Sequence, residues 1–188
     1  AVRTHLEDEV GTTIFEFPTD PPSLPGIRLA DRLDNELDSR GIRTFDGVEV
    51  LDSSRERDSI TDVWTDGFPG RIQADQFVLA TGGLIGGGIV ETNGTLTEAI
   101  FDLDVTASRN RAEWVNPDPR GVQPFAEFGL RIDDRCRPTA SGGPRFENLR
   151  ACGTILAGGD FIAQQATSGV SIATGVRAGR IAAEEASR

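Results

Sequence analysis

The sequence predicts an α/β fold in which part of a parallel sheet is joined to an antiparallel β-meander and to a smaller cap subdomain. Three stretches carry this prediction: an amphipathic helix at Ile27–Arg40, an apolar strand at Gln76–Ala80 that ends in glycines, and a strand at Asn148–Leu156 that leads into a long helix. Strands that alternate with helices favour a parallel sheet, because a parallel connection has to cross over the sheet.

Residues 1–26 are predicted to form a truncated helix, a short strand and a proline-rich loop. Residues 1–9 have the character of a helix end. Thr12–Phe17 is β-branched and aromatic, which favours a strand. Pro18–Gly26 contains four prolines, so we expect an extended loop there, because proline is excluded from helix interiors and central strands. This loop would either link two domains or shape a pocket.

Residues 27–83 are predicted to form a helix, a β-meander and a buried strand. The helix at Ile27–Arg40 gathers its apolar side chains on one face, and Gly41 suits its C-terminal cap. After it we expect strands at Ile42–Leu51 and Ser59–Thr65, a charged bend over residues 53–58, a turn at Asp66–Gly70 and a short polar segment at Arg71–Ala74.

Residues 84–144 are predicted to form the cap subdomain, since prolines interrupt any long element and Phe125, Phe128 and Leu130 supply an apolar face. Residues 145–188 are predicted to return to the main domain with the strand at Asn148–Leu156 and a helix at Val170–Ala186. Gly175 and Gly179 lie four residues apart in that helix, which we expect to allow close packing on a sheet.

Composition limits the classes of function. The chain has 188 residues, 37% of them hydrophobic, with 30 acidic and 19 basic residues and a formal net charge of −11. This balance argues against nucleic acid or an anionic membrane as a direct partner, because their phosphate groups would be repelled. No apolar stretch is long enough for a transmembrane helix, and the charged start does not fit a signal peptide.

The charged residues are unusual in kind. All 19 basic residues are arginine, 17 of the 30 acidic residues are aspartate, and methionine is absent. An Asp-rich, Lys-free surface suits concentrated salt, where charge repulsion is screened within a few ångströms, so we expect a halophilic source. A GC-rich genome would explain only the missing lysine. Because no methionine starts the chain, we expect a processed chain or a piece of a longer protein.

The cysteines and the histidine argue against metal and triad chemistry. Cys136, Cys152 and His5 are the only residues of these types, and they form no ligand-spacing motif, so a metal site is not expected. We expect two free thiols in a cytosolic protein. A single histidine near the terminus also argues against a Ser-His-Asp triad.

Two glycine-bearing turns carry the strongest functional signal. The strand at Gln76–Ala80 runs into Thr81-Gly82-Gly83, and the later strand runs into Gly158-Gly159-Asp160 before the last helix. Glycine lets a backbone approach a ligand closely, and a helix N-terminus offers unpaired N–H groups and a partial positive charge. The turns therefore suit a ligand with an electron-rich edge. A turn or N-cap role is the alternative for Asp160.

The two turns resemble the later fingerprints of the glutathione-reductase-type flavoprotein fold. The first fingerprint of that fold, GxGxxG, is absent from this chain, and we expect it upstream, in a nucleotide-binding βαβ unit. Over nearly its whole length the chain also resembles the C-terminal half of the B subunit of the anaerobic glycerol-3-phosphate dehydrogenases. The segments that carry this resemblance are Pro18–Leu29, Phe77–Glu91, Arg111–Pro138 and Glu147–Gly175.

The resemblance implies part of an FAD/NAD(P)-binding Rossmann-like domain and a set of cofactor-binding residues. These are Thr81, Gly82, Gly83, Gly158, Gly159, Asp160, Gln164, Thr167, Ser168 and Gly169. Arg109, Arg111 and Arg137 are our candidates for a substrate phosphate, because a guanidinium fork matches its oxygens. Pairing with neighbouring aspartates is the alternative for these arginines. No residue stands out as the catalytic base.

The resemblance also implies a function. It implies FMN or FAD as cofactor and oxidation of sn-glycerol 3-phosphate to dihydroxyacetone phosphate. Electrons would pass through a flavin-containing catalytic subunit and an iron–sulfur membrane-anchor subunit to quinone, on the inner face of the membrane. A non-catalytic scaffold that supports a partner subunit is the alternative. Because the pyrophosphate-binding turn is not in this sequence, we expect the isolated chain to be inactive.

Overall fold

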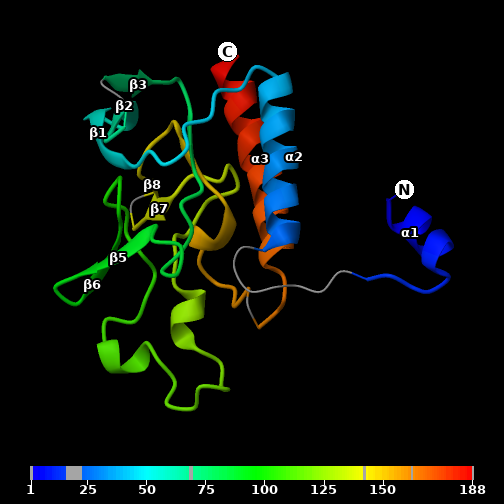
Figure 1. The fold of residues 1–188 in the computed structure, drawn as a ribbon. Coiled ribbons are helices and arrows are strands. Elements are labelled where there is room, and N and C mark those ends of the chain that lie inside the picture. The colour runs from blue at the N-terminus through cyan, green and yellow to red at the C-terminus, as the bar shows by residue number, and fades with distance from the viewer. Residues whose placement is uncertain (1, 16–22, 68–69, 142, 162, 188) are drawn as a thin grey trace. The chain divides into compact units, whose positions relative to one another are not determined.

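The computed structural model describes residues 2–15, 23–67, 70–141, 143–161 and 163–187. The chain divides into two compact units, Ala1–Gly47 and Val48–Arg188. In the described residues the first unit contains helices, and the second contains the strands, three short 3-10 helices and the C-terminal helix (Figure 1). The α/β class is thereby confirmed.

The first unit contains α1 (Val2–Val10) and α2 (Leu24–Ser39). Both expected helices are confirmed, but α2 begins earlier than predicted. Ser23 is its N-cap and accepts a hydrogen bond from the Gly26 N–H at 3.2 Å, while Pro25 lies in the first turn, where its missing N–H is tolerated. The loop prediction is therefore wrong for residues 24–26, and residues 18–22 lie outside the described part.

The strand predicted at Thr12–Phe17 is wrong for residues 12–15, which form a turn and irregular backbone. The side chain of Phe15 is 76% exposed, so the apolar character of this stretch is not matched by any burial. Residues 16 and 17 lie outside the described part. The cap predicted after α2 is confirmed: Gly41 has φ +69°, and its N–H donates to the Asp38 carbonyl at 2.9 Å.

The second unit begins with the predicted meander. Strands β1 (Val50–Glu56), β2 (Ser59–Thr65) and β3 (Arg71–Gln73) form an antiparallel sheet in that order. The strand predicted at Ile42–Leu51 is wrong over residues 42–49, because pairing with β2 starts only at Val50. The bend predicted over residues 53–58 is also wrong for 53–56. These residues continue β1, an edge strand whose charged side chains remain in water.

A parallel pair connects distant parts of the chain. Strand β4 (Phe77–Leu79) pairs with β9 (Leu149–Ala151), with Leu79 opposite Ala151. Both lie within strands expected from the sequence, so the parallel pairing is confirmed. The second strand is shorter than predicted, because Gly153 has φ +81° and starts a 3-10 helix, η3 (Gly153–Ile155).

Between these strands lies the irregular segment that was predicted to form the cap. Its apolar residues Phe128 and Leu130 pack on the core, and the Phe128 ring meets the edge of Trp114 at a centroid distance of 6.1 Å. The regular elements of this segment are β5 (Ile89–Thr92), β6 (Thr95–Glu98), η1 (Arg111–Glu113), η2 (Pro124–Glu127), β7 (Thr139–Ala140) and β8 (Gly143–Pro144).

The C-terminal helix α3 spans Thr167–Ala186 and starts three residues before the predicted Val170. Ala178 and Ala182 are its buried residues, and Ala178 packs beside the free thiols of Cys136 and Cys152. The expectation that Gly175 and Gly179 mediate close packing is wrong, since no described atom lies within 4 Å of a Cβ built on either glycine. None of the described helices is long and apolar enough to cross a membrane.

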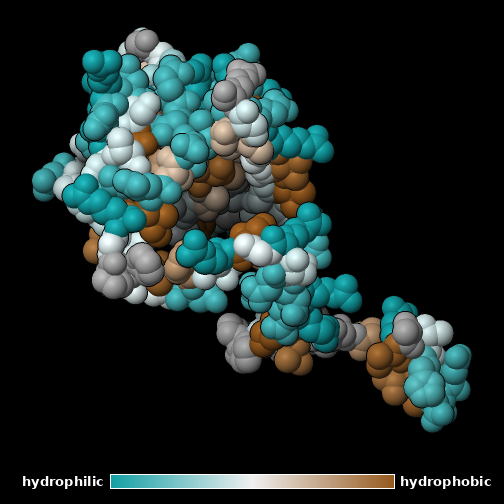
Figure 2. All heavy atoms as spheres, turned by 90° about the horizontal axis from the view of Figure 1, so that it is seen from above, coloured by the Kyte–Doolittle hydropathy of each residue, from teal (hydrophilic) through white to brown (hydrophobic). Residues whose placement is uncertain are grey.

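Of the acidic residues in the described part of the chain, only Asp62, Glu98 and Asp160 are buried, and hydrophilic residues cover most of the face visible in Figure 2. We predict that the melting temperature rises between 0.1 M and 2 M KCl, because salt screens the repulsion within a chain of net charge −11. Exposed ion pairs also weaken in salt, but each contributes only about 0–1 kcal/mol. Differential scanning fluorimetry with sucrose as a non-ionic control measures this. A melting temperature that falls as KCl rises would contradict the expected halophilic adaptation.

Candidate functional site

A glycine-rich turn follows β4 and packs against η3. Gly82 has φ +80°, a conformation that other residues rarely adopt. A Cβ on Gly83 would lie 2.8 Å from the Thr154 carbonyl oxygen, and one on Gly88 would overlap the Gly82 carbonyl oxygen. The turn therefore needs glycine at these positions, because backbone approaches backbone with no room for a side chain.

A cavity of about 280 Å³ opens beside this turn. Side chains or backbone from three distant segments line it: the glycine-rich turn, η2 with its neighbour Phe128, and the stretch from η3 to the start of α3. The complete lining is Gly83, Leu84, Ile85, Gly86, Phe125, Ala126, Phe128, Thr154, Phe161 and Thr167. Ligand cavities are typically apolar with a few polar groups, and this cavity has that character.

The N-terminus of α3 borders the cavity at Thr167. Ala166 occupies the N-cap position, so no side chain there caps the helix. The Thr167 hydroxyl instead donates to the Phe161 carbonyl at 3.2 Å. The N-terminus of this 20-residue helix carries a partial positive charge and unpaired N–H groups. This end of the cavity therefore favours a ligand group that is negatively charged.

The second predicted turn, Gly158–Asp160, leads into the same wall through Phe161. Gly158 has φ +93°, and a Cβ on Gly159 would collide with the Phe161 ring. Asp160 is 9% exposed, and its Oδ1 accepts a hydrogen bond from the Ala163 N–H at 2.9 Å. Asp160 thus caps the turn that follows it, which is the alternative role expected for this residue. Its Oδ2 accepts no hydrogen bond from the described residues and is available to a ligand hydroxyl.

The structure brings some of the ten predicted cofactor-binding residues together at the cavity. Gly83 and Thr167 line it directly. Thr81 and Gly82 belong to the same turn as Gly83, and Gly158, Gly159 and Asp160 belong to the loop that supplies Phe161. Gln164, Ser168 and Gly169 are exposed and are not among the residues that line the cavity.

Sequence reasoning missed most of the wall of the cavity. Thr154, Leu84, Ile85 and Phe161 line it, although none of them was among the predicted site residues. Phe125 and Phe128 were expected only as the apolar face of a cap. Their spacing in the sequence predicted that Phe125 and Phe128 are buried. It did not indicate that their side chains face this cavity.

None of the three candidate phosphate-binding arginines lines this cavity. Arg111 pairs with Glu91 at 3.5 Å and lies over the Trp114 ring. Arg137 pairs with Asp133 at 2.8 Å and with Glu147. Burial lowers the pKa of Arg137, but the hydrogen bond and charge of Asp133 outweigh burial, so that pKa is raised. Arg111 and Arg137 therefore pair with carboxylates, as the alternative interpretation of these arginines expected. Arg109 is exposed.

Comparisons with known proteins agree with the motifs. The model of the FAD binding domain family matches residues 1–170. The probable B subunit of the anaerobic glycerol-3-phosphate dehydrogenase of Halobacterium salinarum is 43% identical over 186 residues, which are 97% of this chain and 44% of that protein. The B subunit of the anaerobic glycerol-3-phosphate dehydrogenase of Yersinia pestis is 34% identical over 172 residues, which are 91% of this chain and 40% of that protein. The resemblance expected from the motifs is confirmed.

The matches cover most of this chain but only part of each relative. The chain spans less than half the length of the curated relatives that it matches, 44% and 40% for the two proteins named above. No solved structure shows a significant match to the chain.

Proposed function

This chain belongs to the family of FAD-binding domains, and from that membership we propose that it forms the flavin-side part of an oxidoreductase subunit. The observation that carries the proposal is the cavity lined jointly by Gly83 and Thr167. Gly83 lies in the first predicted turn, and Thr167 begins the helix that follows the second. These two segments lie far apart in the sequence, and a shared cavity is what a single ligand held by both would require.

The residues at the cavity fit a flavin. The glycine-rich turn supplies Gly83 and Gly86 to the cavity wall, so no side chain there would separate its backbone from a planar ring. The hydroxyl oxygen of Thr81 is buried and has no hydrogen-bond partner among the described residues. A buried polar atom without a partner is costly, so it suits a site that a ligand completes.

We assign roles to this chain's residues on that basis. Phe125, Phe128 and Phe161 would exclude water from the ring, and the N-terminus of α3 would stabilise negative charge on its edge. The Oδ2 of Asp160, which accepts no hydrogen bond from the described residues, would accept hydrogen bonds from ribityl hydroxyls. A bound flavin supplies a hydride acceptor for the oxidation of an alcohol.

The names of the relatives indicate a more specific function. We propose that the complete protein takes part in oxidising sn-glycerol 3-phosphate to dihydroxyacetone phosphate. We further propose that electrons pass to quinone through a flavin-containing catalytic subunit and an iron–sulfur membrane-anchor subunit, which would hold the protein at the inner face of the membrane. The Rossmann-like arrangement would be completed by a GxGxxG unit, which this sequence lacks.

A visible absorption spectrum of the purified complete protein tests the proposed function. We predict flavin absorption bands in the wild type, and a flavin content at least about threefold lower in Asp160→Ala, because the variant loses both the ribityl acceptor and the cap on Ala163. Arg109→Ala is the matched control, since Arg109 is exposed and does not line the cavity. A wild type without flavin bands would favour the scaffold alternative.

A further inference from the structure

A second cavity, of about 430 Å³, lies next to the first. Phe128 lines both cavities, and the consecutive residues Pro124 and Phe125 line the second and the first. The two cavities therefore share a wall. The lining of the second cavity includes Thr106, Ser108, Glu127, Phe128, Arg131 and Gly158.

Backbone hydrogen bonds fix the two charged residues of this cavity. The Leu130 N–H donates to the Ile155 carbonyl at 2.8 Å, and the Ala157 N–H donates to the Leu130 carbonyl at 2.9 Å. This pairing places Arg131 directly beside the loop that continues into Gly158. The Gly158 N–H in turn donates to the carbonyl of Glu127 at 3.0 Å. Arg131 and Glu127 are thus held at the same loop by rigid backbone.

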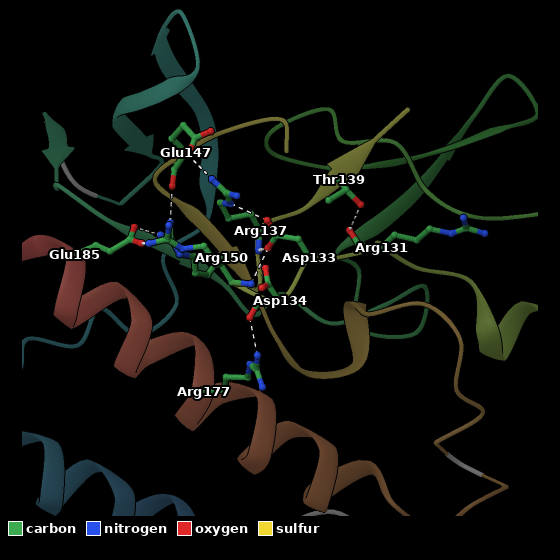
Figure 3. A network of polar contacts seen from close by, with 10 residues as sticks. Arg131, Asp133, Asp134, Arg137, Thr139, Glu147, Arg150, Arg177 and Glu185 are labelled. Carbon is green, nitrogen blue, oxygen red and sulfur yellow. Dashed lines mark hydrogen bonds and ion pairs between the residues drawn. The ribbon is translucent and has the colours of Figure 1, made fainter. Parts of the chain in front are cut away.

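The Arg131 guanidinium has no ion pair or hydrogen bond among the described residues. In this it differs from Arg137 and Arg150, which pair with nearby carboxylates. Figure 3 shows those arginines within one polar network, while the Arg131 side chain extends away from it. In a chain with 30 acidic and 19 basic residues, a cation in a cavity without a carboxylate partner is available to an external anion.

The other polar groups of the cavity differ in availability. The Ser108 hydroxyl is engaged, since it donates to Glu113 at 2.7 Å. The carboxylate of Glu127 and the hydroxyl of Thr106 have no partner among the described side chains and backbone. The cavity therefore offers one cation, one carboxylate and one free hydroxyl.

We propose that this cavity binds the substrate, and that its ligand is a small hydroxylated phosphate monoester. Arg131 takes the phosphate through its guanidinium fork. Glu127 and Thr106 hydrogen-bond the hydroxyl groups, and the Glu127 carboxylate disfavours ligands that carry only an anion. The inference deepens the proposed function, on which it rests, and it places the phosphate on Arg131 instead of on Arg109, Arg111 or Arg137.

Isothermal titration of the complete protein with glycerol 3-phosphate tests this assignment. We expect Arg131→Gln to raise the Kd at least about tenfold, because a charge-assisted hydrogen bond is lost, and Arg131→Lys to lie between that variant and the wild type. Arg120→Gln is the matched control, since Arg120 is exposed and lines neither cavity. The melting temperature and the flavin spectrum should not change in Arg131→Gln, because the guanidinium makes no hydrogen bond or ion pair with the described residues.

Titrations with glycerol and with inorganic phosphate distinguish the role of Arg131 from that of Glu127. Glycerol, which has no phosphate, should bind the wild type and Arg131→Gln equally weakly. In Glu127→Gln we expect weaker binding of glycerol 3-phosphate but equal or tighter binding of inorganic phosphate, since a repelling carboxylate is removed. An unchanged Kd for glycerol 3-phosphate in Arg131→Gln, or a wild type that does not bind it, would overturn the assignment. A wild type that lacks flavin would instead defeat the proposed function.

Discussion

Replacing Arg150 with alanine is expected to lower the free energy of unfolding by about 3 kcal/mol, the lower end of what breaking a buried ion pair costs. Arg150 lies in β9, and its side chain is 0% exposed. It pairs with Glu185 near the end of α3 and donates to the Glu147 carbonyl at 2.7 Å. The Arg150–Glu185 ion pair therefore connects α3 to β9 of the parallel pair.

The electrostatics around Arg150 explain why the cost falls at the lower end. Burial lowers the pKa of Arg150, and the positive charges of Arg135 and Arg137 lower it further. Figure 3 shows Arg137, Arg150 and Glu185 in one network. When Arg150 is removed, Glu185 keeps Arg135 as a partner, so its carboxylate is not left without a cation.

Urea unfolding followed by far-UV circular dichroism measures this effect. Arg180→Ala is the matched control, because Arg180 lies on α3 but is exposed, and it should change the free energy by less than about 0.5 kcal/mol. Equal stability of Arg150→Ala and the wild type would show that the buried pair contributes nothing.

The burial of Arg150 could not be predicted from the sequence, although the strand that carries it could. The apolar run around it predicts a strand, but its partner Glu185 lies 35 residues further along the chain. The same limit applies to β1. Its charged residues favour a bend on local grounds, yet they form an edge strand because β2 offers a pairing partner. The local sequence pattern identifies the apolar segments. Whether a polar segment forms a strand or a bend depends instead on pairing with residues far away in the sequence.

The hairpin in the cap was predictable from the sequence but was not predicted. Asn93 and Gly94 have φ +53° and +81° and connect β5 to β6. Asn-Gly between strand residues is a strong signal for a two-residue hairpin turn, and both residues stand in the sequence. The prolines of residues 84–144 favour irregular backbone, but they all lie beyond the hairpin, so they do not bear on its strands.

The part of the site that could be predicted is the glycine-rich turn, because glycine is needed where the backbone leaves no room for a side chain. The glycines of the turn after β4 indicated a close approach, and the structure has that approach at Gly83 and Thr154. The aromatic wall was not predictable, because a phenylalanine carries the same signal in a core and in a cavity. The position of Arg131 was likewise hidden. It depends on the pairing of Leu130 with Leu156, which no local pattern indicates.

Replacing Gly88 with alanine is expected to lower the flavin content of the complete protein at least about tenfold. Its Cβ would overlap the Gly82 carbonyl oxygen and approach Thr81. Gly88 cannot move aside freely, because its carbonyl accepts from the Ala99 N–H at 3.1 Å and the following Ile89 is buried. The strain therefore passes to the turn, and overpacking of this kind costs about 1–3 kcal/mol.

Gly87→Ala is the matched control for this change. Gly87 has φ +83°, so alanine there costs about 1–2 kcal/mol of backbone strain, but no described atom lies within 4 Å of its Cβ. Absorption spectra of both variants, normalised to protein concentration, report the flavin content. Both carry the same methyl group one residue apart, so flavin lost only from Gly88→Ala reports the overlap with Gly82. Equal flavin contents in the two variants would mean that the shape of this turn does not determine cofactor retention.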